Sequence, residues 1–188
     1  MWSAHAETLN IPVVIYERAS VPAKLLAKAK SHYAAVLGRA GITVEWHTDA
    51  SKNGGTVDRL PLIIYIVTKD EAKGLHRPSH GLGMAFTSPT GQTLGTAVIL
   101  YDQLEFVAQK HEAMLPLMLG HVMAHETGHV LLGSAHSVSG VMKTEWRTAD
   151  YYEAEQGRGV FNPHEARKMR EALLGKRPDI ARSGLSYR

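Results

Sequence analysis

Three histidines and one glutamate in a short stretch are the residues of this sequence best suited to chemistry. The stretch HETGHVLLGSAH spans residues 125–136. His125 and His129 are four residues apart, which places both side chains on one face of a helix, about 6 Å apart along its axis. Two imidazoles in this arrangement can bind one tetrahedral zinc ion. Glu126 lies about 100° further round the helix, where it can reach a metal-bound water without binding the metal.

This arrangement, HExxH, indicates hydrolytic chemistry. Zinc lowers the pKa of a bound water toward about 7, and the glutamate accepts the proton and passes it to the leaving group. Catalytic zinc usually has three protein ligands, and His136 is the predicted third ligand, carried back toward the metal after a helix that ends at Gly133. The alternatives for the third position lie further along the chain: Glu153, Glu155, Asp150 and His164.

Each of these residues also has a purely structural interpretation. His125, Glu126 and His129 could belong to an ordinary helix with buried, hydrogen-bonded histidines. His121 forms a second pair at four-residue spacing with His125 but has Val122 in the place of the glutamate. We therefore expect His121 to support the ligands or to pack in the core. Gly128 costs about 1 kcal/mol relative to alanine inside a helix, so another part of the backbone is expected to approach it closely.

Hydrophobic patterns and turn residues predict the elements that position this stretch. The second predicted helix carries HETGH, and the third is capped by Asn162 with Pro163 at its first position. The segment 134–159 shows no periodicity and is predicted to be loop-rich. The predicted strands are 11–17, 42–48, 60–68, 83–88 and 96–103, and the predicted helices are 21–41, 111–133 and 163–176.

These motifs resemble the metzincin clan of zinc metallopeptidases, whose pattern is HExxHxxGxxH followed by a turn containing methionine. The glycine and the third histidine each come one residue later here than in the clan. Lys143 and Thr144 stand where the clan has a tyrosine after the methionine. The residues that carry the resemblance are His125, Glu126, His129, Gly133, His136 and Met142.

The resemblance implies an α+β, zincin-like fold in a single domain covering 1–188. It implies an N-terminal lobe over about 8–133, with a mixed twisted sheet, two helices and the active-site helix. A small loop-rich C-terminal lobe with one helix would follow over about 134–178. Met142 would form the floor of the site, and a tyrosine, Tyr151 or Tyr152, could polarise the substrate carbonyl. An edge strand would hold an extended substrate through Gly83, Met84, Ala85 and Phe86.

Composition narrows the classes of function. The chain has 188 residues, of which 44% are hydrophobic and 21% charged, with a net charge of +3. Its lysines and arginines are scattered, so no nucleic-acid partner is expected. It has no cysteine, which excludes disulfides, cysteine-ligated zinc and a thiol nucleophile. No apolar run reaches the roughly 20 residues needed to cross a bilayer.

The sequence therefore predicts a zinc-dependent metallopeptidase that acts on a peptide or protein. A zinc amidase acting on a small or cell-wall-like substrate, a non-catalytic zinc-stabilised binding module and a metal-free structural protein are the alternatives. The resemblance favours a secreted or periplasmic location. The first residues form no complete signal peptide, although Ala4-His5-Ala6 fits a cleavage pattern. Substrate preference and oligomeric state have no readable signal.

Overall fold

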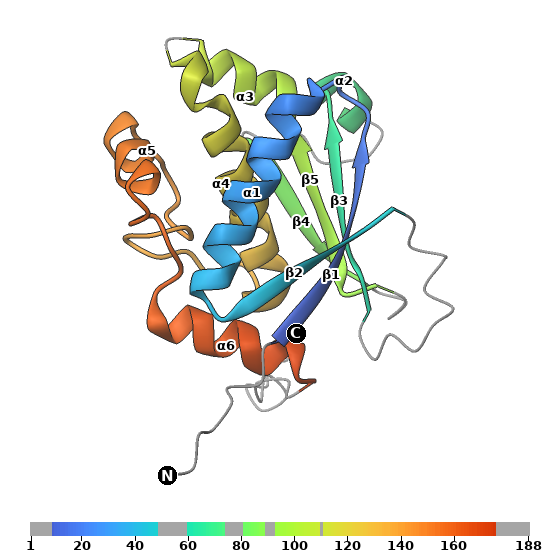
Figure 1. Ribbon diagram of the computed structural model, residues 1–188. Helices are drawn as coiled ribbons and strands as arrows, with labels where there is room; N and C mark the ends of the chain where they lie inside the picture. Colours follow the sequence, from blue (N-terminus) through green and yellow to red (C-terminus); the bar gives the residue numbers. More distant parts are fainter. Residues whose placement is uncertain (1–8, 49–59, 74–80, 89–92, 110, 176–188) are drawn as a thin grey trace, which may run out of the picture.

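A five-stranded sheet with the strand order β2-β1-β3-β5-β4 forms the centre of the molecule (Figure 1). The computed structural model describes residues 9–48, 60–73, 81–88, 93–109 and 111–175. The pairs β1–β2, β1–β3 and β3–β5 are parallel, and β4 pairs antiparallel with β5. The strands are β1 (Leu9–Glu17), β2 (Ile42–His47), β3 (Leu62–Val67), β4 (Gly83–Thr87) and β5 (Gly95–Leu100). The predicted α+β class with a mixed sheet is confirmed.

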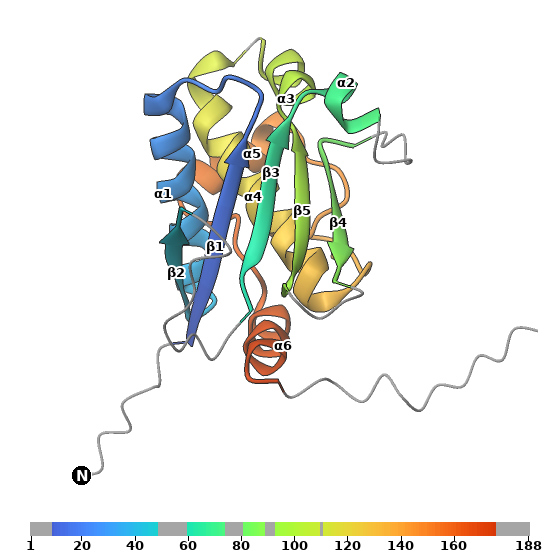
Figure 2. The ribbon, with the colours of Figure 1, turned by 90° about the vertical axis from the view of Figure 1, so that its right-hand side faces the viewer.

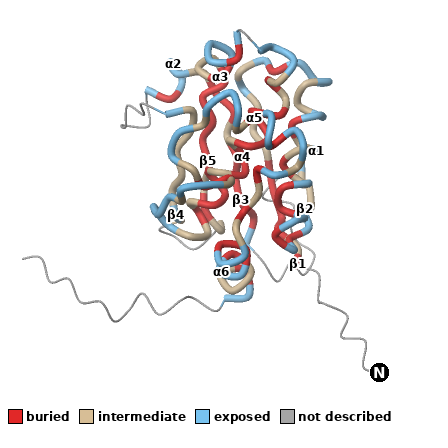
Figure 3. Tube along the Cα trace, turned by 90° about the vertical axis from the view of Figure 1, so that its left-hand side faces the viewer, coloured by how far each residue is buried: buried red, intermediate tan, exposed pale blue. Residues whose placement is uncertain are grey.

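The two longest helices, α1 (Ala23–Arg39) and α4 (Leu115–Leu132), lie on one face of the sheet (Figure 2). Alternate strand residues such as Ile11, Ile64 and Ile99 are fully buried in one core with residues of both helices. β3 is buried on both faces over most of its length, as its continuous apolar run predicts. Buried residues are concentrated along the central strands and α4 (Figure 3). Burial of this apolar surface fixes α4 against the sheet.

α4 begins and ends close to the predicted limits, with one difference. Residues 112–114 form a short 3-10 turn, η2 (Glu112–Met114), and α4 starts only at Leu115. Pro116 stands in the first turn, where the missing N–H costs nothing. Gly133 ends the helix with a φ of +86°, a conformation that favours glycine.

Three helices were absent from the expected elements, so the predicted helix count of both lobes is wrong. α2 (Lys69–Ala72) is a single turn held by a capping box between Thr68 and Glu71. α3 (Tyr101–Ala108) follows β5 with no intervening turn, so the predicted strand 96–103 ends early, at Leu100. α5 (Thr148–Glu155) lies in the segment expected to be a loop. Each helix is short, and one or two turns leave little periodicity in the sequence.

The last helix, α6 (Pro163–Leu173), matches its predicted start. The Asn162 side chain accepts hydrogen bonds from the backbone N–H groups of His164 and Glu165, at 3.0 Å each. No helix in the described part of the chain is both long and apolar enough to span a membrane. The cleavage-like Ala4-His5-Ala6 and the end of the predicted helix beyond Gly175 lie outside the described residues.

Candidate active site

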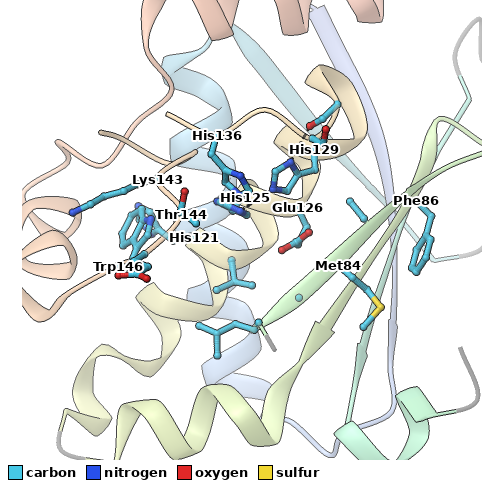
Figure 4. A pocket seen from close by; sticks show the side chains of 18 of the residues that line it. Met84, Phe86, His121, His125, Glu126, His129, His136, Lys143, Thr144 and Trp146 are labelled. Carbon is cyan, nitrogen blue, oxygen red and sulfur yellow. Dashed lines mark hydrogen bonds between the residues drawn. The ribbon is translucent and has the colours of Figure 1, made fainter. Parts of the chain in front are cut away.

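α4 brings His125 and His129 together, and the segment after the helix adds His136 (Figure 4). The ring centroids of His125 and His129 are 4.6 Å apart. His136 has its ring centroid 5.4 Å from that of His125 and 4.7 Å from that of His129. One ring nitrogen from each histidine lies within 4.8 Å of the other two. The four-residue spacing produces the helical pair as predicted, and the extra residue before His136 does not keep it from joining the pair.

The hydrogen bonds of the helical pair fit a bound cation. Nδ1 of His125 is 2.8 Å from the Val141 carbonyl oxygen, and Nδ1 of His129 is 2.9 Å from that of Gly133. A carbonyl oxygen only accepts, so each Nδ1 carries a proton, and in a neutral ring Nε2 then carries a lone pair. The two Nε2 atoms lie 3.0 Å apart. Two ligand nitrogens on one tetrahedral zinc ion are about 3.3 Å apart, so a shared cation fits a separation in which two lone pairs would repel.

Two of the three histidines, His125 and His136, have lowered pKa values, which favours the neutral form that binds metal. The pKa of His125 is lowered to about 4, chiefly by burial; the hydrogen bond to Val141 raises it, and the neighbouring His129 and His136 lower it. Burial also lowers the pKa of His136, and His129 adds to that effect. Neutral imidazole is the ligand form, so no proton has to leave either ring at neutral pH.

A tight turn after His136 packs against α4, the helix that carries the other two histidines. The Ser137 N–H donates to the Met142 carbonyl oxygen at 2.8 Å and so closes the turn. Val141 of the same turn accepts the hydrogen bond from His125. The Met142 side chain is buried, and a Cβ atom on Gly128 would lie 2.3 Å from its sulfur. The predicted role of Met142 as the floor of the site stays a prediction; its side chain packs against Gly128 of α4.

The structure explains why a glycine stands at position 128 inside α4, but the neighbouring group is not the expected one. Its nearest atoms are the Met142 sulfur and the Phe161 ring, at 2.3 and 3.0 Å from a built Cβ, so side chains rather than backbone exclude a larger residue. The expectation of a close backbone approach is therefore wrong. Gly128 and Met142 are 14 residues apart in the sequence, and neither residue type by itself predicts that the two are in contact.

Glu126 is 6% exposed and lies between α4 and β4. Burial raises the pKa of its carboxyl group to about 8. A Cβ atom on Gly83 would lie 2.8 Å from Cγ and Oε1 of Glu126, so glycine at position 83 makes room for this side chain. A carboxyl group with a pKa near the working pH can both accept and return a proton.

A cleft of about 1100 Å³ opens beside the three histidines and Glu126. β4 forms one wall, and the segment from Lys143 to Trp146, with Tyr151, forms the other (Figure 4). Tyr151 is buried and packs on Trp146, with ring centroids 5.2 Å apart. Tyr152 is 47% exposed and is not among the residues that line the cleft. Trp146 has no counterpart among the predicted site residues, since an isolated tryptophan gives no local signal.

β4 is one of the two edge strands of the described sheet, and its residues fall into two sets. The Leu100 N–H donates to the Leu82 carbonyl oxygen at 2.9 Å. In an antiparallel pair the backbone groups alternate between facing the partner strand and facing away from it. The backbone groups of Met84 and Phe86 therefore face β5, whereas those of Gly83 and Ala85 face the open edge beside Glu126. The sequence did not distinguish these two sets.

The alternative third ligands are engaged elsewhere or lie apart from the histidines. Lys143 donates to both Asp150 carboxylate oxygens at 2.7 Å, and the Arg147 N–H donates to Asp150 at the same distance. Glu153 pairs with Arg158 at 2.7 Å. The described residues that can share a metal are His125, His129 and His136, without Glu155 or His164.

His121 is buried and separate from this group. Its Nδ1 lies 3.0 Å from the Leu117 carbonyl oxygen, and its Nε2 lies 3.2 Å from that of Gly159. Its ring packs beside Trp146, with centroids 5.1 Å apart. This placement agrees with the expected supporting or core role.

Comparison with known proteins gives only distant likenesses. No known protein family and no curated protein matches the chain. The crystal structure of archaemetzincin from Methanopyrus kandleri is 14% identical over 92% of this chain and 99% of its own, with a TM-score of 0.49. The solution structure of TM1509 from Thermotoga maritima is 15% identical over 88% of this chain and 91% of its own, with a TM-score of 0.36. Neither likeness is close enough to assign a function, which has to come from the site itself.

Proposed function

We propose that this protein is a zinc-dependent hydrolase, a metzincin-like peptidase that cleaves peptide bonds. One observation carries the proposal: three histidines converge within 4.8 Å beside a buried glutamate at the wall of an open cleft. A purely structural helix has no need of two Nε2 lone pairs pointed at each other 3.0 Å apart. The donor set is all imidazole, which suits zinc.

In this proposal His125, His129 and His136 hold zinc, with the Val141 and Gly133 carbonyl oxygens orienting the two helical ligands. Zinc, when bound, supplies a Lewis acid and an acidified water. Glu126 accepts a proton at its carboxylate and returns it to the leaving amine. Burial of Glu126 raises the pKa of its carboxyl group in the metal-free protein, which favours the protonated form that can return the proton.

The open edge of β4 favours a peptide as the substrate. An extended peptide can pair with the backbone groups of Gly83 and Ala85 as an added strand. That edge passes directly beside Glu126, because Gly83 lies against its side chain. A strand added there would carry its backbone carbonyl groups past the histidines. A small amide would use none of this edge.

The first test is metal content, measured by mass spectrometry on protein purified without added metal. We expect about one zinc ion per chain in the wild type and clear loss in His136→Ala. Zinc retained in His136→Ala would move the third ligand elsewhere, and no zinc after supplementation would end the hydrolase proposal.

The second test is a peptide-library digest with the wild type and with Glu126→Gln. Cleavage by the wild type alone supports a peptidase. Turnover of small amides with no peptide cleavage would favour an amidase. Bound zinc with no turnover of either would indicate a binding module.

A further inference from the structure

Met84 and Phe86 line the cleft although their side chains point away from the metal centre. Successive residues of a strand project to opposite faces of the sheet. Gly83 lies against Glu126 on the helix side, so Met84 and Phe86 project to the other face. There both pack on a small apolar cluster that includes Val98 and Leu100. Figure 4 shows both side chains directed away from the three histidines.

A peptide paired with β4 would place its side chains on these two faces in turn. Residues directly opposite each other on neighbouring strands have their side chains on the same face. Peptide residues opposite Gly83 and Ala85 would face the helices. Those opposite Met84 and Phe86 would lie on the outer face, in contact with the thioether and the aromatic ring.

On the outer face near this edge, the described residues of β4 and β5 are largely apolar. The outer-facing residues of β4 and β5 are all uncharged: Met84, Phe86, Thr96, Val98 and Leu100. An apolar peptide side chain placed there would lose contact with water, which favours binding, whereas a charged one would lose hydration without gaining a partner among these residues.

We propose that Met84 and Phe86 are specificity-determining residues that select apolar side chains at two peptide positions separated by one residue. The inference rests on the proposed function and names its substrate class: extended peptides with apolar residues at alternate positions. Consecutive residues of an extended peptide point to opposite faces of the sheet. The peptide positions that contact Met84 and Phe86 are therefore different from those that face the helices.

The closing experiment determines residue preferences at every position around the cleavage sites of a random peptide library. The variants are Met84→Thr and Phe86→Thr, since threonine keeps the β propensity of the strand. The control is Tyr16→Thr, which removes an aromatic ring from the outer face of β1, where Tyr16 stacks on Tyr65 with ring centroids 5.2 Å apart. β3 and β5 separate β1 from β4.

We expect the wild type and Tyr16→Thr to prefer apolar residues at two alternate positions. Each β4 variant should lose the preference at one of these positions. Its kcat/KM on the preferred peptide should fall about five-fold, as expected for the loss of one cross-strand apolar pair. A second readout is calorimetric binding of a synthetic extended peptide with apolar residues at alternate positions, and of one with lysine at the same positions, to zinc-loaded Glu126→Gln protein with and without Phe86→Thr.

The outcomes separate the two proposals. Cleavage with no alternate preference, or with a preference that Phe86→Thr leaves intact, overturns the specificity while the peptidase stands. Selective binding of the apolar peptide without cleavage by the wild type supports the specificity and removes the peptidase. Neither binding nor cleavage of any peptide overturns both.

Discussion

α4 contains the same histidine spacing twice, and the two pairs behave differently. HVMAH covers 121–125, and HETGH covers 125–129. Both nitrogens of His121 lie near backbone carbonyl oxygens, of Leu117 and Gly159, and so neither is turned toward the other histidines. His129 has one nitrogen at a carbonyl oxygen and turns the other toward His125. The pairs have the same geometry along the helix, and the groups around each ring decide which pair can bind a cation.

The residues between the two histidines of each pair also favour a metal site only in HETGH. The second position is Val122 in one pair and the buried Glu126 in the other. The fourth is Ala124 in one and Gly128, which lies on Met142, in the other. The second pair thus has a proton acceptor and room for the supporting turn. Four-residue spacing by itself is only a framework for a metal site.

The largest effect is expected at the glutamate that only one pair contains. Glu126→Gln should keep about one zinc per chain and lower turnover by about 10²- to 10⁴-fold, because the proton acceptor is removed while the ligands remain. Turnover would be followed on a peptide found in the library digest, alongside metal content. Wild-type turnover in the variant would remove Glu126 from the mechanism.

The next largest effect is a difference in zinc content between variants of His129 and His121, the two histidines that pair with His125. His129→Ala should lose most of its zinc and melt at a lower temperature, because metal-binding energy is also folding energy. His121→Ala should retain its zinc, since neither of its nitrogens faces the other histidines. Metal analysis and thermal melting of both variants check this. Equal zinc loss in the two would contradict the assignment of the pairs.

A smaller effect, on the free energy of unfolding, is expected at Gly128, the fourth residue of HETGH. Gly128→Ala would normally stabilise a helix by about 1 kcal/mol, but here its Cβ would lie 2.3 Å from the Met142 sulfur. We expect a net loss of about 1–2 kcal/mol in the free energy of unfolding, measured with denaturant. In a Met142→Ala background the same change should cost less, and an unchanged cost would show that Met142 is not the obstacle.

The smallest effect concerns the pH dependence of stability at His121. Burial lowers the pKa of His121, so below about pH 6.5 the unfolded state binds more protons than the folded state. Its contribution to stability is present above pH 6.5 and is lost as the pH falls toward the folded pKa. Melting temperatures of chelator-treated protein between pH 8 and pH 5 should fall less steeply in His121→Gln. Parallel curves for the two proteins would count against a buried neutral His121.

The sequence predicts most strands and the long helices because each carries a hydrophobic period over several turns or pairs. It fails for α2, α3 and α5, whose one or two turns leave little periodicity and which also make contacts with distant residues. Lys69 at the start of α2, for example, donates its N–H to Asp102 of α3 at 2.9 Å. For α5, the deciding contact is the one between Lys143 and Asp150, which joins its first turn to the end of the methionine turn.

The sequence by itself determined the helical pair His125 and His129, the adjacent Glu126 and most of the strands, because helix and strand periods are local properties of the chain. Only the tertiary structure decided which of several distant groups joins the pair, why positions 83 and 128 are glycines, and which β4 residues face the open edge. These depend on atoms brought together by burial of the core, such as the Val141 carbonyl oxygen at His125. A backbone carbonyl is the same in every residue, so no sequence pattern marks the one that orients a ligand.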